Sequence, residues 1–194
     1  MNFDYEKLFN INTSGIDEAS EDFHHNRYEP TPYKVLERIL DCKYITKDNT
    51  LIDMGCGKGR VSIFLHHYIG CKVIGIDFSE DYIQAANENK HAYNAHADIK
   101  FVCQKAEEYT FTNEDCFYFF NPFSEEILRS VIDAIIYSYY ENNRPIKLFF
   151  YYPEDSALAY LMGKEELICI DEIECQDLYE TYDERESVFI FEIY

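Results

Sequence analysis

Residues 50–60 read Thr-Leu-Ile-Asp-Met-Gly-Cys-Gly-Lys-Gly-Arg, and this stretch decides the fold. Its first five residues predict a short buried strand, which the alternate glycines Gly55, Gly57 and Gly59 end in a tight turn. After Arg60, apolar residues recur at helical spacing, so a helix should follow the turn directly. A strand, a glycine turn and a helix in succession are typical of the ligand-binding unit of an open α/β sheet.

The remainder of the chain alternates short apolar runs with amphipathic stretches, the pattern of a parallel sheet with helices on both faces. We expect strands at 71–76, 99–103, 116–120 and 146–152, and helices at 35–40, 79–95 and 124–139. Two later apolar runs, 167–173 and 188–193, are separated by a charged loop with no room for a crossover helix, so they should pair antiparallel. The sequence therefore predicts an α/β fold with a mostly parallel seven-stranded sheet and an antiparallel last strand.

Length and charge limit the classes of protein that remain. The chain has 194 residues, enough for one compact core, and its 17 basic and 37 acidic residues give a formal net charge of −20. We expect an N-terminal arm or lid over residues 1–30 and a single domain over residues 31–194. So acidic a protein repels phosphates, which argues against nucleic acid or an anionic membrane as a partner.

The sequence also favours a cytoplasmic protein with no membrane anchor. Its apolar runs are far shorter than the roughly 20 residues of a membrane helix. The N-terminus lacks the basic start and apolar core of a secretory signal. The seven cysteines are an odd number without a Cys-x-x-Cys pair, as expected of reduced thiols. His66, His67, His91 and His96 lack a cysteine or carboxylate partner at a metal-ligand spacing, so we expect no metal site.

A ligand should bind at the carboxyl ends of the strands, where the glycine turn and Asp77 meet. Alternate glycines remove the side chains that would keep a ligand from the backbone, and the helix behind them offers free N–H groups. Asp77 ends the second strand, where a carboxylate can accept the hydroxyls of a ribose. The spacing leaves both a dinucleotide and S-adenosylmethionine open. Gly-x-Gly-x-Gly differs from the dinucleotide fingerprint, however, which disfavours a nicotinamide-dependent oxidoreductase.

Three segments, 51–60, 73–77 and the Asn-Pro-Phe exit of the fourth strand at 121–123, together resemble class I S-adenosylmethionine-dependent methyltransferases. The resemblance covers roughly residues 28–194. The Tyr-x-Pro-Thr-Pro lead-in at 28–32 looks most like small bacterial members related to histone-lysine-methyltransferase-like enzymes. The resemblance implies a three-layer Rossmann-like fold and S-adenosyl-L-methionine as the cofactor.

The resemblance also implies a set of cofactor contacts. The implied residues are Asp53, Gly55, Cys56, Gly57, Gly59, Asp77, Phe78, Gln104, Ala106 and Asn121. Asp53 and the glycine turn would contact the methionine part, and Asp77 the ribose. One position departs from the family, which commonly carries Gly-Asp-Ala after the third strand, because Lys105 stands in place of that Asp. An ammonium cannot accept a hydrogen bond from the adenine amino group, so Gln104, Glu107 or the backbone would have to do so.

Asn121, Pro122 and Phe123 form the candidate catalytic segment. Methyl transfer to nitrogen depends mainly on holding a lone pair in line with the sulfonium methyl. An Asn oxygen and a proline-fixed carbonyl can accept hydrogen bonds from an amine and aim it. The resemblance adds that amino-methyltransferases use an Asn-Pro-Pro-aromatic tetrad here, of which this chain lacks the second proline. A purely structural strand exit is the alternative. His24 and His25 are candidates for a general base or a lid contact, the alternative being an exposed polar arm.

We therefore expect a methyltransferase that acts on an unidentified acceptor by direct in-line transfer, with a small-molecule or protein amine favoured. A catalytically silent S-adenosylmethionine-binding module is the alternative, and a nicotinamide-dependent oxidoreductase is less favoured still. Of the 20 excess negative charges, 16 lie in residues 1–30 and 154–194, the parts that border the acceptor in this class. This placement favours an acceptor that carries positive charge, the alternative being an ordinary solvated surface.

Overall fold

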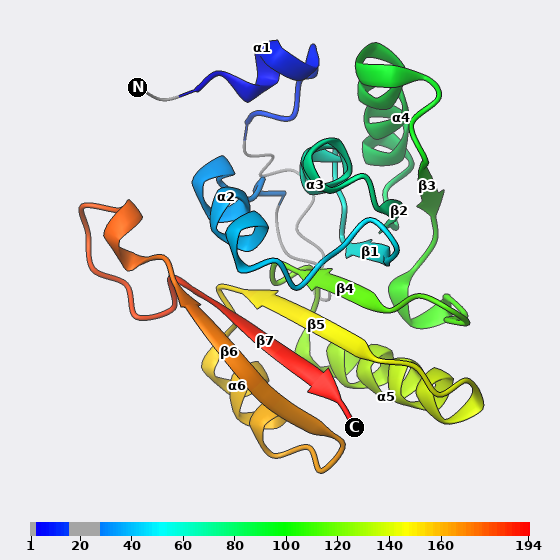
Figure 1. The fold of residues 1–194 in the computed structure, drawn as a ribbon, viewed down its shortest axis with the longest axis vertical. Helices are drawn as coiled ribbons and strands as arrows, with labels where there is room; N and C mark the ends of the chain where they lie inside the picture. The colour runs from blue at the N-terminus through cyan, green and yellow to red at the C-terminus, as the bar shows by residue number, and fades with distance from the viewer. Residues whose placement is uncertain (1–2, 16–27) are drawn as a thin grey trace.

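The computed structural model describes residues 3–15 and 28–194, so His24 and His25 lie outside the described residues. A seven-stranded sheet crosses the molecule in the order β3-β2-β1-β4-β5-β7-β6 (Figure 1). Its strands are β1 (Thr50–Met54), β2 (Lys72–Asp77), β3 (Ile99–Cys103), β4 (Cys116–Phe119), β5 (Ile146–Tyr151), β6 (Leu167–Glu174) and β7 (Ser187–Ile193). Strands β1 to β5 pair in parallel, and β7 is antiparallel to both β5 and β6. The expected mostly parallel sheet with an antiparallel last strand is confirmed.

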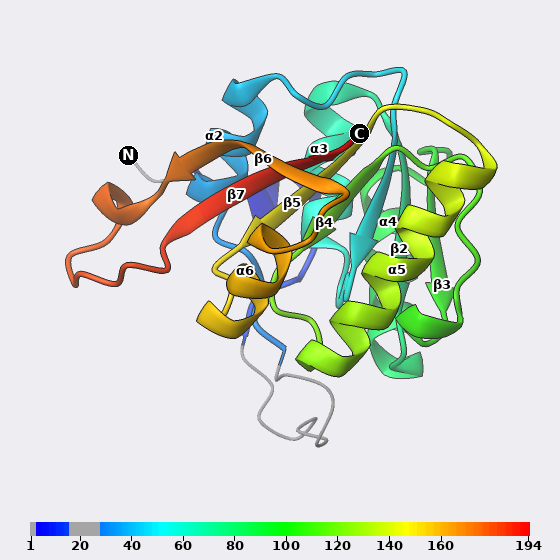
Figure 2. The same cartoon turned by 90° about the horizontal axis from the view of Figure 1, so that it is seen from below.

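Helices cover both faces of this sheet and complete the three-layer Rossmann-like arrangement. On one face lie α2 (Tyr33–Cys42), α3 (Arg60–Ile69) and α4 (Glu80–Asn94), which share one apolar core with the sheet. On the other lie α5 (Glu125–Glu141) and α6 (Asp155–Met162), which share a second core. Figure 2 shows α5 and α6 in front of the strands they cover. Short 3-10 turns stand at η2 (Ala106–Glu108) and η3 (Gln176–Leu178).

Local sequence signals explain where the predicted helices begin and end. The Ser79 hydroxyl accepts a hydrogen bond from the Tyr82 amide at 3.3 Å and caps the start of α4. Gly70 ends α3 with a positive φ of 77°, a conformation that glycine adopts without a β-carbon clash. Helix α6 was not predicted, because its eight residues after Pro153 are too few to show a clear period.

The described N-terminal residues pack against the body of the sheet through a short unpredicted helix, α1 (Tyr5–Phe9). The Phe9 side chain is 2% exposed, and its ring centroid lies 6.3 Å from that of Phe64 in α3. Tyr5 contacts the same ring edge-on, at 5.2 Å between centroids. Residues 3–15 thus contribute to the apolar core, and the division into an arm and a domain near residue 30 stays a prediction.

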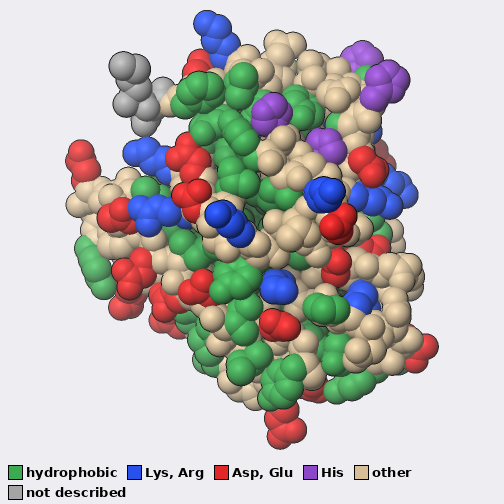
Figure 3. Space-filling model, in the orientation of Figure 1, with side chains coloured by type: hydrophobic (Ala, Val, Ile, Leu, Met, Phe, Trp, Pro, Cys, Tyr) green, Lys and Arg blue, Asp and Glu red, His purple; other side chains and the backbone are tan. Residues whose placement is uncertain are grey.

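Acidic side chains gather over the β6–β7 hairpin and its connecting loop, on the left of the molecule in Figure 3. The loop between these strands carries Asp177, Glu180, Asp183, Glu184 and Glu186. It projects beside the carboxyl end of β5 (Figure 1). These five acidic residues therefore lie near the edge of the sheet at which ligands of such folds bind.

Candidate functional site

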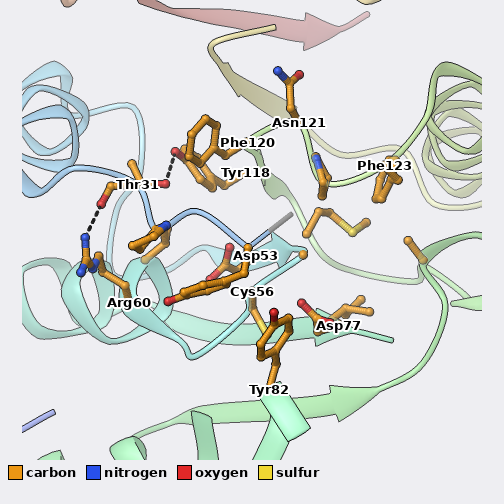
Figure 4. Close-up of a pocket in the computed structure, with 18 of the residues that line it drawn as sticks. Thr31, Asp53, Cys56, Arg60, Asp77, Tyr82, Tyr118, Phe120, Asn121 and Phe123 are labelled. Carbon is orange, nitrogen blue, oxygen red and sulfur yellow. Dashed lines mark hydrogen bonds between the residues drawn. The ribbon is translucent and has the colours of Figure 1, made fainter. Parts of the chain in front are cut away.

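A cavity opens at the carboxyl ends of β1, β2 and β4 (Figure 4). It is lined by residues 28–31, 53–56, 60–61, 76–78, 82, 104, 106, 118 and 120–123. All of the residues implied for cofactor binding or catalysis line it except Gly57 and Gly59, while the candidates His24 and His25 lie outside the described residues. We call it the cofactor cavity, since the residues implied for cofactor binding come together there.

The glycine turn forms one wall of the cofactor cavity, with positive φ angles of 70° at Gly55, 49° at Gly57 and 85° at Gly59. A β-carbon at Gly55 would lie 2.5 Å from Cβ of Pro122, which brings the exit of β4 against the turn. A β-carbon at Gly59 would lie 2.7 Å from the Phe101 ring. Gly57 and Gly59 therefore shape the turn and its packing, while Gly55 also faces the cavity.

Asp77 ties the glycine turn to the start of α4. One of its carboxylate oxygens, Oδ2, accepts a hydrogen bond from the Gly57 amide at 3.0 Å. The other, Oδ1, accepts one from the Ser79 amide, also at 3.0 Å. The residue is 8% exposed and lines the cavity. These contacts fix the orientation of the carboxylate at the cavity wall, and a carboxylate oxygen can accept more than one hydrogen bond.

Asp53 is the second buried carboxylate of the cofactor cavity, at the end of β1. Its Oδ2 accepts hydrogen bonds from the Ser62 amide at 3.1 Å and from the Ser62 hydroxyl at 2.6 Å. Burial raises the pKa of Asp53 to about 7, and the nearby charge of Asp77 adds a smaller upward effect. A cationic group placed beside Asp53 would lower this pKa and favour the carboxylate.

Arg60 connects the N-terminal residues to the cavity, a role that the sequence did not reveal. Its Nε donates to Thr13 Oγ1 at 2.8 Å, one terminal nitrogen donates to the Thr31 carbonyl at 3.1 Å, and the other to Glu6 Oε1 at 3.1 Å. It is the one basic residue among the described residues that line the cavity. Its place at the end of the quoted turn was visible in the sequence, but its partners were not.

Aromatic walls of the cofactor cavity were also missed. They come from Tyr28, Tyr82, Tyr118 and Phe120. The Tyr118 hydroxyl and the Thr31 hydroxyl share a hydrogen bond of 2.9 Å, drawn in Figure 4. The sequence signals for these walls were the aromatic residues of the Tyr-x-Pro-Thr-Pro lead-in and of β4. Most aromatic residues of the chain could equally well be assigned to the apolar core.

Asn121 fixes the exits of two neighbouring strands. Its side-chain amide nitrogen donates to the Tyr152 carbonyl at 2.5 Å, beyond the end of β5. Both residues have positive φ angles, 37° for Asn121 and 53° for Tyr152. Figure 4 shows the Asn121 side chain directed away from Asp53 and Asp77. The amide nitrogen of Asn121 therefore has a structural role, while the catalytic role stays a prediction.

The side of the cavity implied for adenine contains Gln104 and Ala106, and Phe78 also lines the cavity. The Gln104 side-chain nitrogen donates to the Glu108 carbonyl at 2.9 Å, which leaves the Gln104 amide oxygen as the group that can accept. Of the two side chains named as substitutes for the usual Asp, Gln104 lines the cavity, and Glu107 is not among its lining residues.

Within residues 3–15 and 28–194, no group of three or more His, Cys, Asp or Glu residues is arranged to hold a metal ion. Over the same part of the chain, no helix combines the length and the apolarity needed to cross a membrane.

Part of the chain is similar in sequence to known methyltransferases. Residues 51–136 match the family model described as "Methyltransferase domain". The carboxy-S-adenosyl-L-methionine synthase of Shewanella sediminis is 34% identical over 64 residues, covering 31% of this chain and 26% of that protein. The protein-lysine N-methyltransferase of Saccharolobus islandicus is 32% identical over 78 residues, covering 39% of this chain and 48% of that protein. The matches thus span about a quarter to a half of these curated relatives.

Solved structures share the fold over most of the chain. The RNA methyltransferase of Salinibacter ruber, in complex with S-adenosyl-L-homocysteine, gives a TM-score of 0.60 at 19% identity, covering 85% of this chain and 94% of that one. A precorrin-6y C5,15-methyltransferase of Geobacter metallireducens gives a TM-score of 0.59 at 19% identity, covering 95% and 98%. In its matched segment and in its fold, the chain is thus similar to class I S-adenosylmethionine-dependent methyltransferases.

Proposed function

We propose that this chain is an S-adenosylmethionine-dependent methyltransferase whose acceptor is an amine. The observation that carries the proposal is the hydrogen bond from the Gly57 amide to Asp77. It holds a buried carboxylate beside the glycine turn, whose backbone carries few side chains. A ribose needs an acceptor of this kind, and the rest of a nucleoside needs the close backbone approach. The residues present therefore fit the cofactor of the family.

In this proposal, Asp77 and the glycine turn bind and orient the cofactor. The other walls of the cofactor cavity supply charge and shape. S-adenosylmethionine, when bound, would supply a methyl group on a sulfonium: the acceptor's lone pair forms the new bond to carbon, and the electrons of the broken C–S bond stay on sulfur and leave a neutral thioether. Asp53 faces the methionine part and stabilises its cationic amino group. Residues 121–123 lie at the cavity edge and position the acceptor. Positioning of this kind supplies much of the rate, because attack requires an in-line approach at near contact distance.

Charge favours an amine over RNA as the acceptor. The surface beside the carboxyl end of β5 is acidic (Figure 3), and the chain carries a net charge of −20. Phosphates would be repelled there, and a cation would be attracted. Relatives include a protein-lysine N-methyltransferase, whose name indicates an amine acceptor, and fold neighbours include an RNA methyltransferase. The exclusion of nucleic acid thus stays a prediction that rests on charge.

Calorimetric titration with S-adenosylhomocysteine tests the cofactor site. We expect Asp77→Asn to weaken binding at least tenfold, because the amide offers one acceptor oxygen where two backbone N–H groups need a partner. Asp81→Asn, an exposed residue in the first turn of the same helix, should bind like the native protein. Absence of binding by the native protein, or an undiminished affinity of Asp77→Asn, would refute the proposal.

Transfer of labelled methyl into a fractionated lysate tests the acceptor class. We expect the label in a protein or small-molecule fraction, in an acid-stable form bound to nitrogen. Label in RNA would overturn the amine assignment. Cofactor binding without label in any fraction would instead support the silent module.

A further inference from the structure

A second cavity, of about 250 Å³, shares residues 121–123 with the cofactor cavity. Successive side chains of a strand point to opposite faces of the sheet. Tyr118 and Phe120 face the cofactor cavity, and Phe119 between them faces the second one. The second cavity therefore lies on the α5–α6 face, separated from the cofactor cavity by the backbone at the exit of β4. We call it the rear cavity.

The floor of the rear cavity is apolar and aromatic. The rings of Phe119 and Phe150 stack at 4.5 Å between centroids with an interplanar angle of 10°. Phe123 meets Phe119 edge-on at 6.3 Å, and Leu128 and Ala157 complete the wall. A ring or a short aliphatic chain would remove apolar surface from water here, which favours binding.

One polar atom on the wall is buried without a partner. The hydroxyl oxygen of Ser124 has no hydrogen-bond partner within the described part of the chain, although it is shielded from solvent. Ser124 precedes α5 but its side chain makes no capping hydrogen bond. Since unpaired buried hydroxyls are unfavourable, this oxygen is suited to accept a hydrogen bond from a bound donor.

Charge at the rim selects the kind of donor. The described residues that line the rear cavity include Glu125 and Glu154 but neither Lys nor Arg. Glu125 forms an ion pair with Arg129 at 2.5 Å. Arg129 therefore offsets the charge of Glu125 and not that of Glu154. Helices α5 and α6 begin at this rim, and each helix N-terminus contributes about half a positive charge. The further first-turn acids Glu126 and Asp155 outweigh that contribution, so the rim favours a cation.

We propose that the rear cavity binds the acceptor through an apolar ring or short chain that carries a cationic amine. The apolar group lies on the Phe119 and Phe150 rings, and the amine enters as an ammonium that faces Glu154 and donates to the Ser124 hydroxyl. It releases one proton to solvent before its lone pair takes the methyl group. The inference rests on the proposed function, because it assigns the acceptor of that reaction to a cavity that shares residues 121–123 with the cofactor site. It makes an aromatic or aliphatic amine the class of substrate.

The probe for this proposal is 2-phenylethylamine, titrated into the S-adenosylhomocysteine-saturated protein and followed by chemical-shift changes. The matched comparison compounds are neutral 2-phenylethanol and anionic 3-phenylpropionate. We expect the amine to bind at least tenfold more tightly than the acid. Equal or tighter binding of the acid, or no binding of the amine, would overturn the proposal.

Variants locate the bound probe. Ala157→Leu fills the rear cavity and should reduce amine affinity at least tenfold, whereas Ala159→Leu, exposed on the same helix, should leave it unchanged. Glu154→Gln should weaken the amine about threefold or more without affecting the alcohol, with exposed Glu141→Gln, at the other end of α5, as its control. Unchanged amine affinity in Ala157→Leu would refute the location. If that variant does not fold, Ala157→Val applies the same test with a smaller group.

The two proposals fail separately. S-adenosylhomocysteine affinity reports on the cofactor cavity alone, and amine binding can be measured in the cofactor-free protein as well. If the protein binds the amine but not S-adenosylhomocysteine, the methyltransferase proposal and the acceptor role are refuted, but the amine site is not. If the protein binds S-adenosylhomocysteine but not the amine, the rear cavity is refuted as the acceptor site.

Discussion

The ring of Tyr28 lies against the backbone of Gly57, where a β-carbon would come within 2.3 Å of the ring carbon Cε2. The Tyr28 hydroxyl donates to the Thr13 carbonyl at 2.6 Å, and its ring packs 5.1 Å from that of Tyr82. Burial raises the pKa of Tyr28, so the hydroxyl stays protonated as a donor. The glycine turn is thus bounded by a residue far upstream, and the two must fit each other.

Gly57→Ala should disrupt this fit. The new methyl group would displace the Tyr28 ring, and the positive φ of 49° would add backbone strain. We expect S-adenosylhomocysteine affinity to fall at least tenfold in calorimetric titration. Gly70→Ala is the control, because Gly70 has a φ of 77° but no atom within 4 Å of an added β-carbon. It should lower the melting temperature through strain and leave affinity intact. Native-like affinity of Gly57→Ala would contradict the packing role of Tyr28.

Arg60→Leu should destabilise the fold. The Arg60 side chain is 11% exposed and holds Glu6, whose side chain is 22% exposed, at 3.1 Å. Removing one partner of such a pair leaves the other charge poorly solvated, at a cost of about 3 kcal/mol. The control is Arg38→Leu, because Arg38 pairs with Asp177 on the surface at exposures of 37% and 64%. Its loss should change unfolding free energy by less than about 1 kcal/mol. Equal effects of the two variants in urea unfolding would exclude a buried anchoring role for Arg60.

Asn121→Asp should slow transfer. The carboxylate cannot donate to the Tyr152 carbonyl and would repel it, so the exits of β4 and β5 would shift. Displacements near a reacting centre can reduce rates by about 100-fold. We expect labelled-methyl incorporation to fall at least tenfold. Asn142→Asp offers the control, since Asn142 bonds Asn113 at the exposed end of α5. A native rate in Asn121→Asp would show that this strand exit does not position the acceptor.

The unliganded protein should lose stability as pH rises from about 4 to about 7. The pKa of Asp53 is raised to about 7 from an ordinary value of 3.8, so the folded state holds a proton that the unfolded state has released in this range. Stability therefore falls with rising pH, by about 1.4 kcal/mol for each unit of pKa difference. Asp53→Asn should remove this part of the slope in urea unfolding at a series of pH values. Parallel slopes for the two proteins would show that Asp53 does not titrate in this way.

Cofactor binding should couple to the same proton. If Asp53 faces the cationic amino group, its pKa falls on binding and a proton is released near pH 6.5. Calorimetry of S-adenosylhomocysteine in buffers of different ionisation enthalpy measures that release directly. Asp53→Asn, which holds no such proton, should show a smaller buffer dependence.

The predictable part of the site came from residues close together in the sequence. The glycine turn follows β1 and Asp77 ends β2, and these two strands pair in parallel with Asp53 opposite Gly75. Once parallel pairing is inferred, the turn and Asp77 are expected at the same edge of the sheet. Arg60 could not be interpreted in this way, because its partners Glu6, Thr13 and Thr31 lie far upstream in a segment without clear period. The short helices α1 and α6 were missed for the same reason, since five and eight residues provide too little periodicity.

By itself, the sequence determined the parallel sheet, the glycine turn at its centre and the acidic residue at the tip of β2. Hydrophobic period and turn chemistry act over a few residues, so they can be read along the chain. Only the tertiary structure decided that Tyr28 closes onto Gly57, that Asn121 binds the end of β5, and that a rear cavity lies behind residues 121–123. Cavities and long-range contacts arise where side chains from distant segments meet, and no local pattern encodes the shape they leave between them.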